Sequence, residues 1–143
     1  MSPIARSLQH LNSSASLPGV LDAACVAFET LLAEIRAHED PDSPMFAALV
    51  MAAASAADGR DAVLLAPSLP WPPTPPEPEL PAAAGLADGS PGVIELMAAL
   101  CQALVSRLRQ VAGTAADSRD QNACRAAIRS ARAAGDLLAG TSR

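Results

Sequence analysis

The sequence predicts an all-α protein: a four-helix bundle-like single domain with a long Pro-rich crossover between two pairs of helices. Apolar residues recur every three or four positions along most of the chain, and no run of β-branched residues alternates as a strand does. A dense proline run separates two alanine-rich helical halves, residues 1–66 and 91–143. At 143 residues the chain has the length of one domain with one core.

The first half contains three predicted helices, a short first one and two that form one pair of the bundle. The first begins at Ser2, the second at Ser16 or Pro18, and the third at Ser43, because a serine caps free backbone N–H groups and a proline fits the first turn. We expect the third helix to stop at Asp58-Gly59. The inward stripes are, in order, Ile4, Leu8 and Leu11; Leu21, Cys25, Phe28, Leu32 and Ile35; and Phe46, Leu49, Val50, Ala53 and Ala57.

The crossover comprises residues 67–90. Before it, residues 62–65 form either a short further helical turn or an extended stretch, and we favour the helix. Eight of the fifteen residues from Pro67 to Pro81 are proline, which excludes a helix interior or a central strand. We therefore expect a polyproline II segment, at about 3.1 Å per residue, that reaches across a long face of the domain. Residues 82–92 follow it as a flexible tail.

The second half contains two predicted helices. Ser90-Pro91 starts one, which Gly113 closes. Asp117, with Asp120 three residues later, caps the last helix, which stops at Gly140. The inward stripes are Val93, Met97, Leu100, Leu104, Leu108 and Val111 on the first helix, and Cys124, Ile128, Ala131 and Leu138 on the second.

The charges of the two halves are opposite. Residues 1–90 hold three arginines and eleven acidic residues, whereas residues 91–143 hold seven arginines and four acidic residues. We expect the halves to pair, within one chain rather than between two. The net charge of −5 argues against nucleic acid or an anionic membrane as the partner. All ten basic residues are arginine, a bias explained by a GC-rich genome or by selection for the bidentate hydrogen bonding of arginine. We predict a bacterial protein.

The three cysteines predict buried free thiols. Cys25, Cys101 and Cys124 are odd in number, lie far apart, and fall on the apolar stripes of their helices. Free thiols suit a reducing compartment, and the N-terminal residues lack the pattern of a secretion signal. The longest uncharged apolar stretch, residues 45–57, is too short to span a bilayer. The sequence therefore predicts a cytoplasmic location.

The residues available for catalysis are few. His10 and His38 are the only histidines, and the chain has neither lysine nor tyrosine. A metal site built on Glu34, His38 and Asp42 would need a ligand from elsewhere. The glycine-rich loops that bind phosphates are absent. We predict no catalytic residue, no metal and no cofactor, and rank catalysis by carboxylates lowest among the possible functions.

Protein–protein interaction, with another protein or as a homodimer, is the predicted function. The candidate partner-binding residues are Trp71, Pro72 and Pro73 in the proline run, and Arg125, Arg129 and Arg132 on the last helix. The prolines form Pro-x-x-Pro units that dock into aromatic grooves, although a stiff spacer packed on its own bundle explains them as well. An exposed Trp71 would favour docking. We expect the arginines to meet the acidic residues of 22–42, in the bundle or across a dimer.

The alternative is a small-molecule-binding or regulatory bundle. Its apolar pocket would lie between helices and be lined by Phe28, Phe46, Met97 and Leu100. Ordinary core explains the same four residues better than a pocket does. If the chain has a ligand pocket, we expect a cavity and a rise in melting temperature with an apolar compound. If it is an interaction protein, we expect the molecular mass of its complex to depend on the partner.

Overall fold

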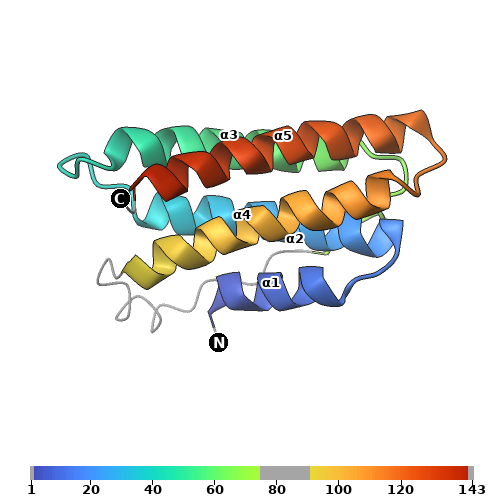
Figure 1. Ribbon diagram of the computed structural model, residues 1–143, viewed down its shortest axis with the longest axis horizontal. Helices are drawn as coiled ribbons and strands as arrows, with labels where there is room; N and C mark the ends of the chain where they lie inside the picture. The colour runs from blue at the N-terminus through green and yellow to red at the C-terminus, as the bar shows by residue number, and fades with distance from the viewer. Residues whose placement is uncertain (1, 75–90, 142–143) are drawn as a thin grey trace.

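The computed structural model describes residues 2–74 and 91–141, and these ranges form five helices (Figure 1). The helices are α1 (Pro3–Ser13), α2 (Leu17–Ala37), α3 (Phe46–Leu64), α4 (Pro91–Ala112) and α5 (Ser118–Thr141). No strand occurs among the described residues, and the predicted all-α class is confirmed. The predicted polyproline II segment does not begin at Pro67, because the Leu69 N–H donates to the Ala66 carbonyl oxygen at 3.2 Å in a turn. The part of the predicted crossing beyond Thr74, and the predicted tail up to residue 90, lie outside the described residues.

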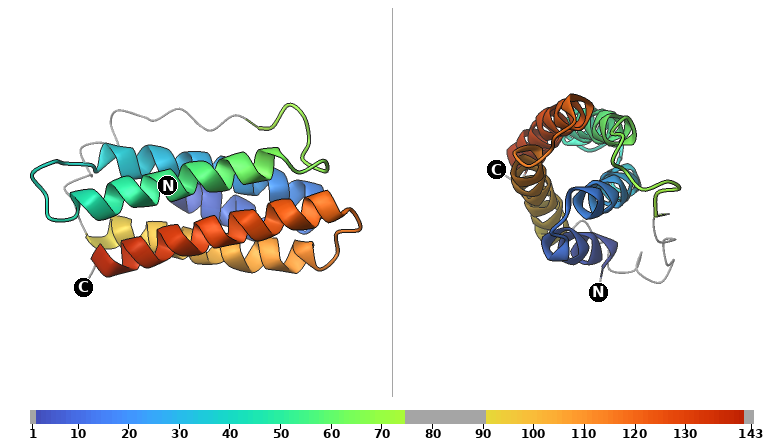
Figure 2. Two further views of the ribbon diagram at one scale, coloured as in Figure 1. Left: turned by 90° about the horizontal axis from the view of Figure 1, so that it is seen from above. Right: turned by 90° about the vertical axis from the view of Figure 1, so that its right-hand side faces the viewer.

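Helices α2, α3, α5 and α4 pack in that order around a closed ring, in which each contacts its two neighbours. Neighbours run antiparallel, and α2 and α5 lie diagonally opposite, as do α3 and α4 (Figure 2). Helix α1 packs outside this ring, against α2 and α4. Helix α3 ends at one end of the molecule and α4 begins at the other, so the two helices that the crossover connects are diagonal members of the ring (Figure 1).

The core is made mostly of aliphatic side chains around α2, which contacts α1, α3 and α4. The largest fully buried side chains are Phe28, Ile4, Leu11, Leu21, Leu31, Ile35, Leu49, Met97, Leu100, Leu104, Leu108 and Leu138. Alanines fill much of the rest, which allows the helices to approach closely. Cys25, Cys101 and Cys124 are buried free thiols, as predicted.

Two of the three predicted serine caps of the first half are confirmed. The Ala5 N–H donates to Ser2 Oγ at 3.1 Å, and the Gly19 N–H donates to Ser16 Oγ at 3.1 Å. The third is wrong, because Ser43 Oγ accepts from the Met45 N–H in a turn that precedes the helix. Helix α3 begins at Phe46, with no side-chain cap.

The predicted stop at Asp58-Gly59 is wrong. Helix α3 continues through both residues to Leu64, so the helical prediction for residues 62–64 is confirmed as part of α3. Gly59 is buried, and a Cβ built on it would overlap the ring of Phe28 from α2. The glycine therefore provides close helix packing, and that packing outweighs its cost of about 1 kcal/mol in a helix interior.

One predicted inward residue of α3 points outward. Val50 is 40% exposed, and its neighbour Met51 is 58% exposed. Residues 45–57 carry no charge, so the sequence marks no polar face on this part of the helix. The orientation of α3 is set instead by its two neighbours in the ring, α2 and α5.

Candidate functional site

The described part of the proline-rich segment, residues 66–74, is attached to the bundle at two points; we call it the Trp71 loop. Ser68 donates its backbone N–H to Asp120 Oδ1 at 3.0 Å and its hydroxyl to Oδ2 at 2.6 Å. Thr74 donates its N–H to Asp22 Oδ1 at 2.9 Å and its hydroxyl to Oδ2 at 2.7 Å. Each attachment uses both oxygens of one carboxylate, which fixes the donor residue in orientation as well as position.

The two carboxylates differ in burial. Asp120 lies in the first turn of α5 and is 2% exposed, so its two hydrogen bonds offset the cost of burying a charge. Asp22 of α2 is half-buried. The predicted cap by Asp117 is confirmed, because its Oδ1 accepts the Arg119 N–H at 2.8 Å at the start of α5. The predicted capping role of Asp120 is wrong, because Asp120 reaches across to the Trp71 loop.

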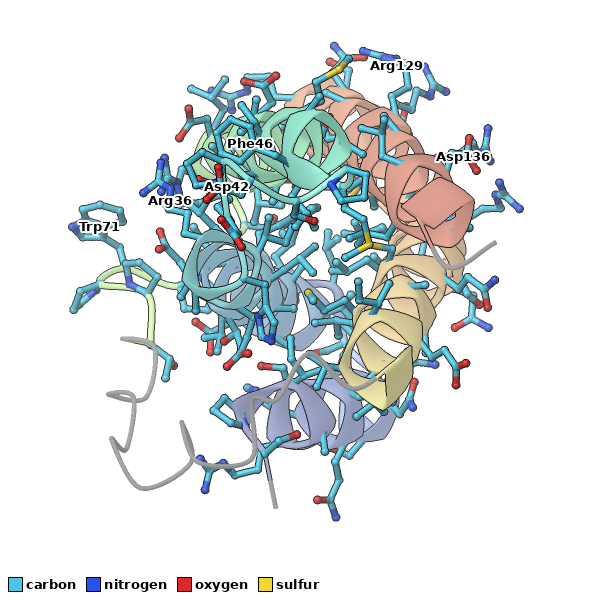
Figure 3. The ribbon with its side chains drawn as sticks, turned by 90° about the vertical axis from the view of Figure 1, so that its left-hand side faces the viewer. Arg36, Asp42, Phe46, Trp71, Arg129 and Asp136 are labelled. Carbon is cyan, nitrogen blue, oxygen red and sulfur yellow. The ribbon has the colours of Figure 1, made fainter. Side chains whose placement is uncertain are left out.

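Trp71 is exposed midway between the two attachments, three residues from Ser68 and three from Thr74. Its side chain is 78% exposed and stands away from the bundle (Figure 3). Leu69, two residues earlier, is buried and packs into the core cluster. Of the other predicted loop residues, Pro72 is exposed and Pro73 is half-buried, and the Trp71–Pro72 peptide bond is cis.

The predicted arginine stripe lies at exposed positions of α5, and Arg132 also lines a groove between α4 and α5. Arg125, Arg129 and Arg132 are all exposed, and none makes an ion pair with a described residue. Their expected pairing with acidic residues 22–42 inside the bundle is wrong, because α5 and α2 lie on a diagonal and do not contact each other.

One ion pair instead joins an acidic residue and an arginine that both belong to the first half of the chain. Glu29 of α2 accepts from Arg60 of α3 at 3.3 Å. Trp71 and Arg129 lie on opposite sides of the molecule (Figure 3), so the two groups of predicted partner-binding residues do not form one surface.

The residues of the alternative pocket are distributed between the core and its edge. Phe28 of α2 and both Met97 and Leu100 of α4 are fully buried in the same apolar cluster. Phe46, the first residue of α3, is half-buried. None of the four lines the groove that we find between α4 and α5.

This groove was missed by the sequence reasoning. It has a volume of about 530 Å³, an apolar floor that includes Cys101, Val105 and Gly135, and arginines on its rim. An ideal Cβ on Gly135 would lie 3.1 Å from Cys101 Cβ, so the glycine marks a close approach of the two helices. A glycine in the interior of a predicted helix was the one available sequence signal.

The three buried thiols lie in surroundings that disfavour the thiolate. Burial raises the pKa of Cys25 to about 11 and that of Cys101 to about 12, and it also raises the pKa of Cys124. All three thiols are therefore protonated near neutral pH and are poor nucleophiles. His38 Nδ1 lies 2.8 Å from the Glu34 carbonyl oxygen at the end of α2. No group of three potential metal ligands occurs in residues 2–74 or 91–141.

Comparison with known proteins adds no relative. No protein-family model, curated protein or solved structure matches this chain. None of the helices described here is both long enough and apolar enough to cross a membrane.

Proposed function

We propose that this chain is a non-catalytic protein-interaction module that presents Trp71 to a protein partner. One observation carries the proposal. The only tryptophan of the chain is 78% exposed, although the loop that bears it is attached to the bundle on both sides. A tryptophan that served only to pack the loop would lie against the bundle, as Leu69 does.

The free energy available from Trp71 is large. A tryptophan side chain buries about 150–250 Å² in an interface, which at about 25 cal/mol per Å² gives about 4–6 kcal/mol. Such residues dominate the binding energy of many interfaces. Because Ser68 and Thr74 already fix the loop, little conformational entropy remains to be lost when a partner binds.

The chemistry of the remaining groups supports a binding role rather than a catalytic one. The raised pKa values of Cys25 and Cys101 keep these thiols protonated, and both side chains are buried. His38 is held by the end of its own helix. No described histidine, thiol and carboxylate gather in one place.

The test compares Trp71→Ala with Met51→Ala, which removes another exposed apolar side chain from α3. We expect both variants to keep their free energy of unfolding within about 0.5 kcal/mol, because both side chains are exposed. Proteins captured by the wild-type chain and by Met51→Ala, but lost from Trp71→Ala, are then purified. Their dissociation constants for Trp71→Ala should be at least about tenfold weaker by calorimetry.

The mass of the purified chain decides whether the partner is a second copy. A dimer in light scattering that Trp71→Ala converts to a monomer would identify a homodimer. The proposal fails if Trp71→Ala retains every protein that the wild type binds, at equal affinity, and leaves the mass unchanged.

A further inference from the structure

We propose that the groove between α4 and α5 binds an amphipathic organic anion: a molecule with an elongated apolar body and one carboxylate head. The groove lies on the side of the bundle toward which Asp136 of α5 points, away from Trp71 (Figure 3). This inference is independent of the proposed role of Trp71.

The size and floor of the groove suit an apolar body. Its volume, about 530 Å³, falls within the usual range of small-molecule sites, about 300–1,000 Å³. Along α4 the lining extends from Ala98 to Gln110, a length of about 18 Å at 1.5 Å per residue. The floor consists of small or apolar side chains: Ala98, Cys101, Val105, Ala131 and Gly135.

Two arginines on opposite walls provide a place for the head. Cys101 of α4 faces Gly135 of α5, and the two helices run antiparallel. Measured along the helix axes from the level of Cys101 and Gly135, Arg109 lies about 12 Å towards the end of α4. Arg132 lies about 4.5 Å in the same direction along α5. Their Cα atoms are therefore offset by about 7.5 Å along the groove, a distance that two long side chains span to reach one carboxylate.

The charge of these arginines is not neutralised by the described chain. Neither Arg109 nor Arg132 forms an ion pair with a residue of 2–74 or 91–141. Asp136, which also lines the groove, lies about 1.5 Å beyond Gly135 along α5, on the side away from Arg109 and about 6 Å from Arg132. The carboxylate head is therefore placed between Arg109 and Arg132, and the apolar body extends toward Ala98.

The packing of α1 on the other side of α4 shows how this fold covers the seam between two helices. Helix α1 packs against both α2 and α4, and it buries Ile4 and Leu11 there. No described helix covers the α4–α5 groove in the same way. The arginines on the rim favour an occupant with a negative charge. In this respect the occupant differs from α1, which carries Arg6 and His10.

The test is a titration of the full chain with decanoate, followed by calorimetry and by the NMR signals of the Val105 methyl groups. We expect saturable binding of one decanoate per chain, with shifts at Val105 and an unchanged Trp71 indole signal. Arg132→Gln and Arg109→Gln should each weaken binding about tenfold, because each removes a charged hydrogen-bond donor. Arg129→Gln removes the same charge from the outer face of α5 and should leave the affinity within about twofold.

Two further comparisons measure the contributions of the carboxylate head and of the apolar body to binding separately. Decanamide, which has the same chain without the charge, should bind about tenfold more weakly than decanoate. Ala98→Phe fills the floor and should abolish binding while the helical circular dichroism is retained. Trp71→Ala should bind decanoate like the wild type, so a failure here is distinct from a failure of the proposed function.

Several results would overturn the inference. Binding that does not saturate, or that Arg129→Gln weakens as much as Arg132→Gln, would show a general attraction of charge. Equal affinities for decanoate and decanamide would show that the arginines do not hold the head. A dimer that dissociates in Arg132→Gln would show that a second copy of the chain occupies the groove.

Discussion

Gly59 and Gly135 show how single residues position the helices. Both lie inside helices, where glycine costs about 1 kcal/mol relative to alanine. Gly59 faces the ring of Phe28, and Gly135 faces Cys101. A glycine inside a helical pattern is consistent with either a helix end or a close packing contact, and the sequence reasoning chose the helix end at Gly59. The choice depends on a residue about thirty positions away, which local pattern does not reveal.

Gly59→Ala should destabilise the protein by about 1–3 kcal/mol, because the new Cβ overlaps the Phe28 ring and this strain exceeds the gain in helix propensity. The measurement is the midpoint of urea unfolding. Gly140→Ala is the matched control, since a Cβ there meets no atom within 4 Å, and it should be neutral or slightly stabilising. A Gly59→Ala protein as stable as the wild type would contradict the packing described for α2 and α3.

Because of the three thiols, we expect the free energy of unfolding to depend on pH in the alkaline range. Burial raises the pKa of Cys101 to about 12 and that of Cys25 to about 11, from 9.0. The full contribution of the thiols to the free energy of unfolding is present below pH 9, where they are protonated in both the folded and the unfolded chain. It is lost as the pH rises from 9 towards these values, since the unfolded chain then releases protons that the folded chain retains.

We therefore expect the free energy of unfolding to fall between pH 9 and pH 11, by at most about 1.4 kcal/mol per pH unit for each thiol. No lysine or tyrosine side chain is present to titrate in this window. Urea unfolding at several pH values measures the slope, and Cys101→Ala should reduce it. A slope equal to that of the wild type in Cys101→Ala would mean that the Cys101 thiol does not contribute to it.

At the scale of elements, the Trp71 loop depends on contacts between segments far apart in the sequence. The proline run indicates a segment that is neither helix nor strand, but its composition does not specify which side chains attach it. Asp120 was assigned to the start of its own helix, because a carboxylate in the first turn usually serves there. It binds Ser68 instead, 52 positions earlier.

Asp120→Ala should cost about 1–3 kcal/mol, because it leaves the Ser68 N–H without its acceptor at a partly buried site. Asp22→Ala removes the same pattern of two hydrogen bonds from Thr74, but at a more exposed site than that of Asp120, and should cost about 1 kcal/mol or less. Hydrogen exchange of the Ser68 and Thr74 amides gives the local effect of each variant. Equal costs for the two variants would contradict the difference in burial.

At the scale of the whole molecule, the topology decides which charges meet. The sequence divides charge between an acidic and a basic half, and we expected these halves to pair within the chain. The ring places α2 and α5 on a diagonal, so most of the stripe on α5 faces solvent. The interhelical ion pair between Glu29 and Arg60 joins two helices of the acidic half.

Reversing two charges of the stripe, in the variant Arg125→Glu plus Arg129→Glu, should change the free energy of unfolding by less than about 0.5 kcal/mol per site. Both side chains are exposed and form no ion pair with the described residues. Thermal unfolding of the variant and of the wild type measures the difference. A large loss of stability in the monomeric protein would indicate an intramolecular partner for the stripe.

The amino-acid sequence by itself determined the helical class, the approximate extent of most helices, two serine caps and the burial of the thiols. These features follow from apolar periodicity and from residues within a few positions of one another. Only the tertiary structure decided the exposed face of α3, the continuation of α3 through Gly59, the attachment of the Trp71 loop and the groove between α4 and α5. Each of these depends on which helices become neighbours, and that is fixed by packing between residues distant in the sequence.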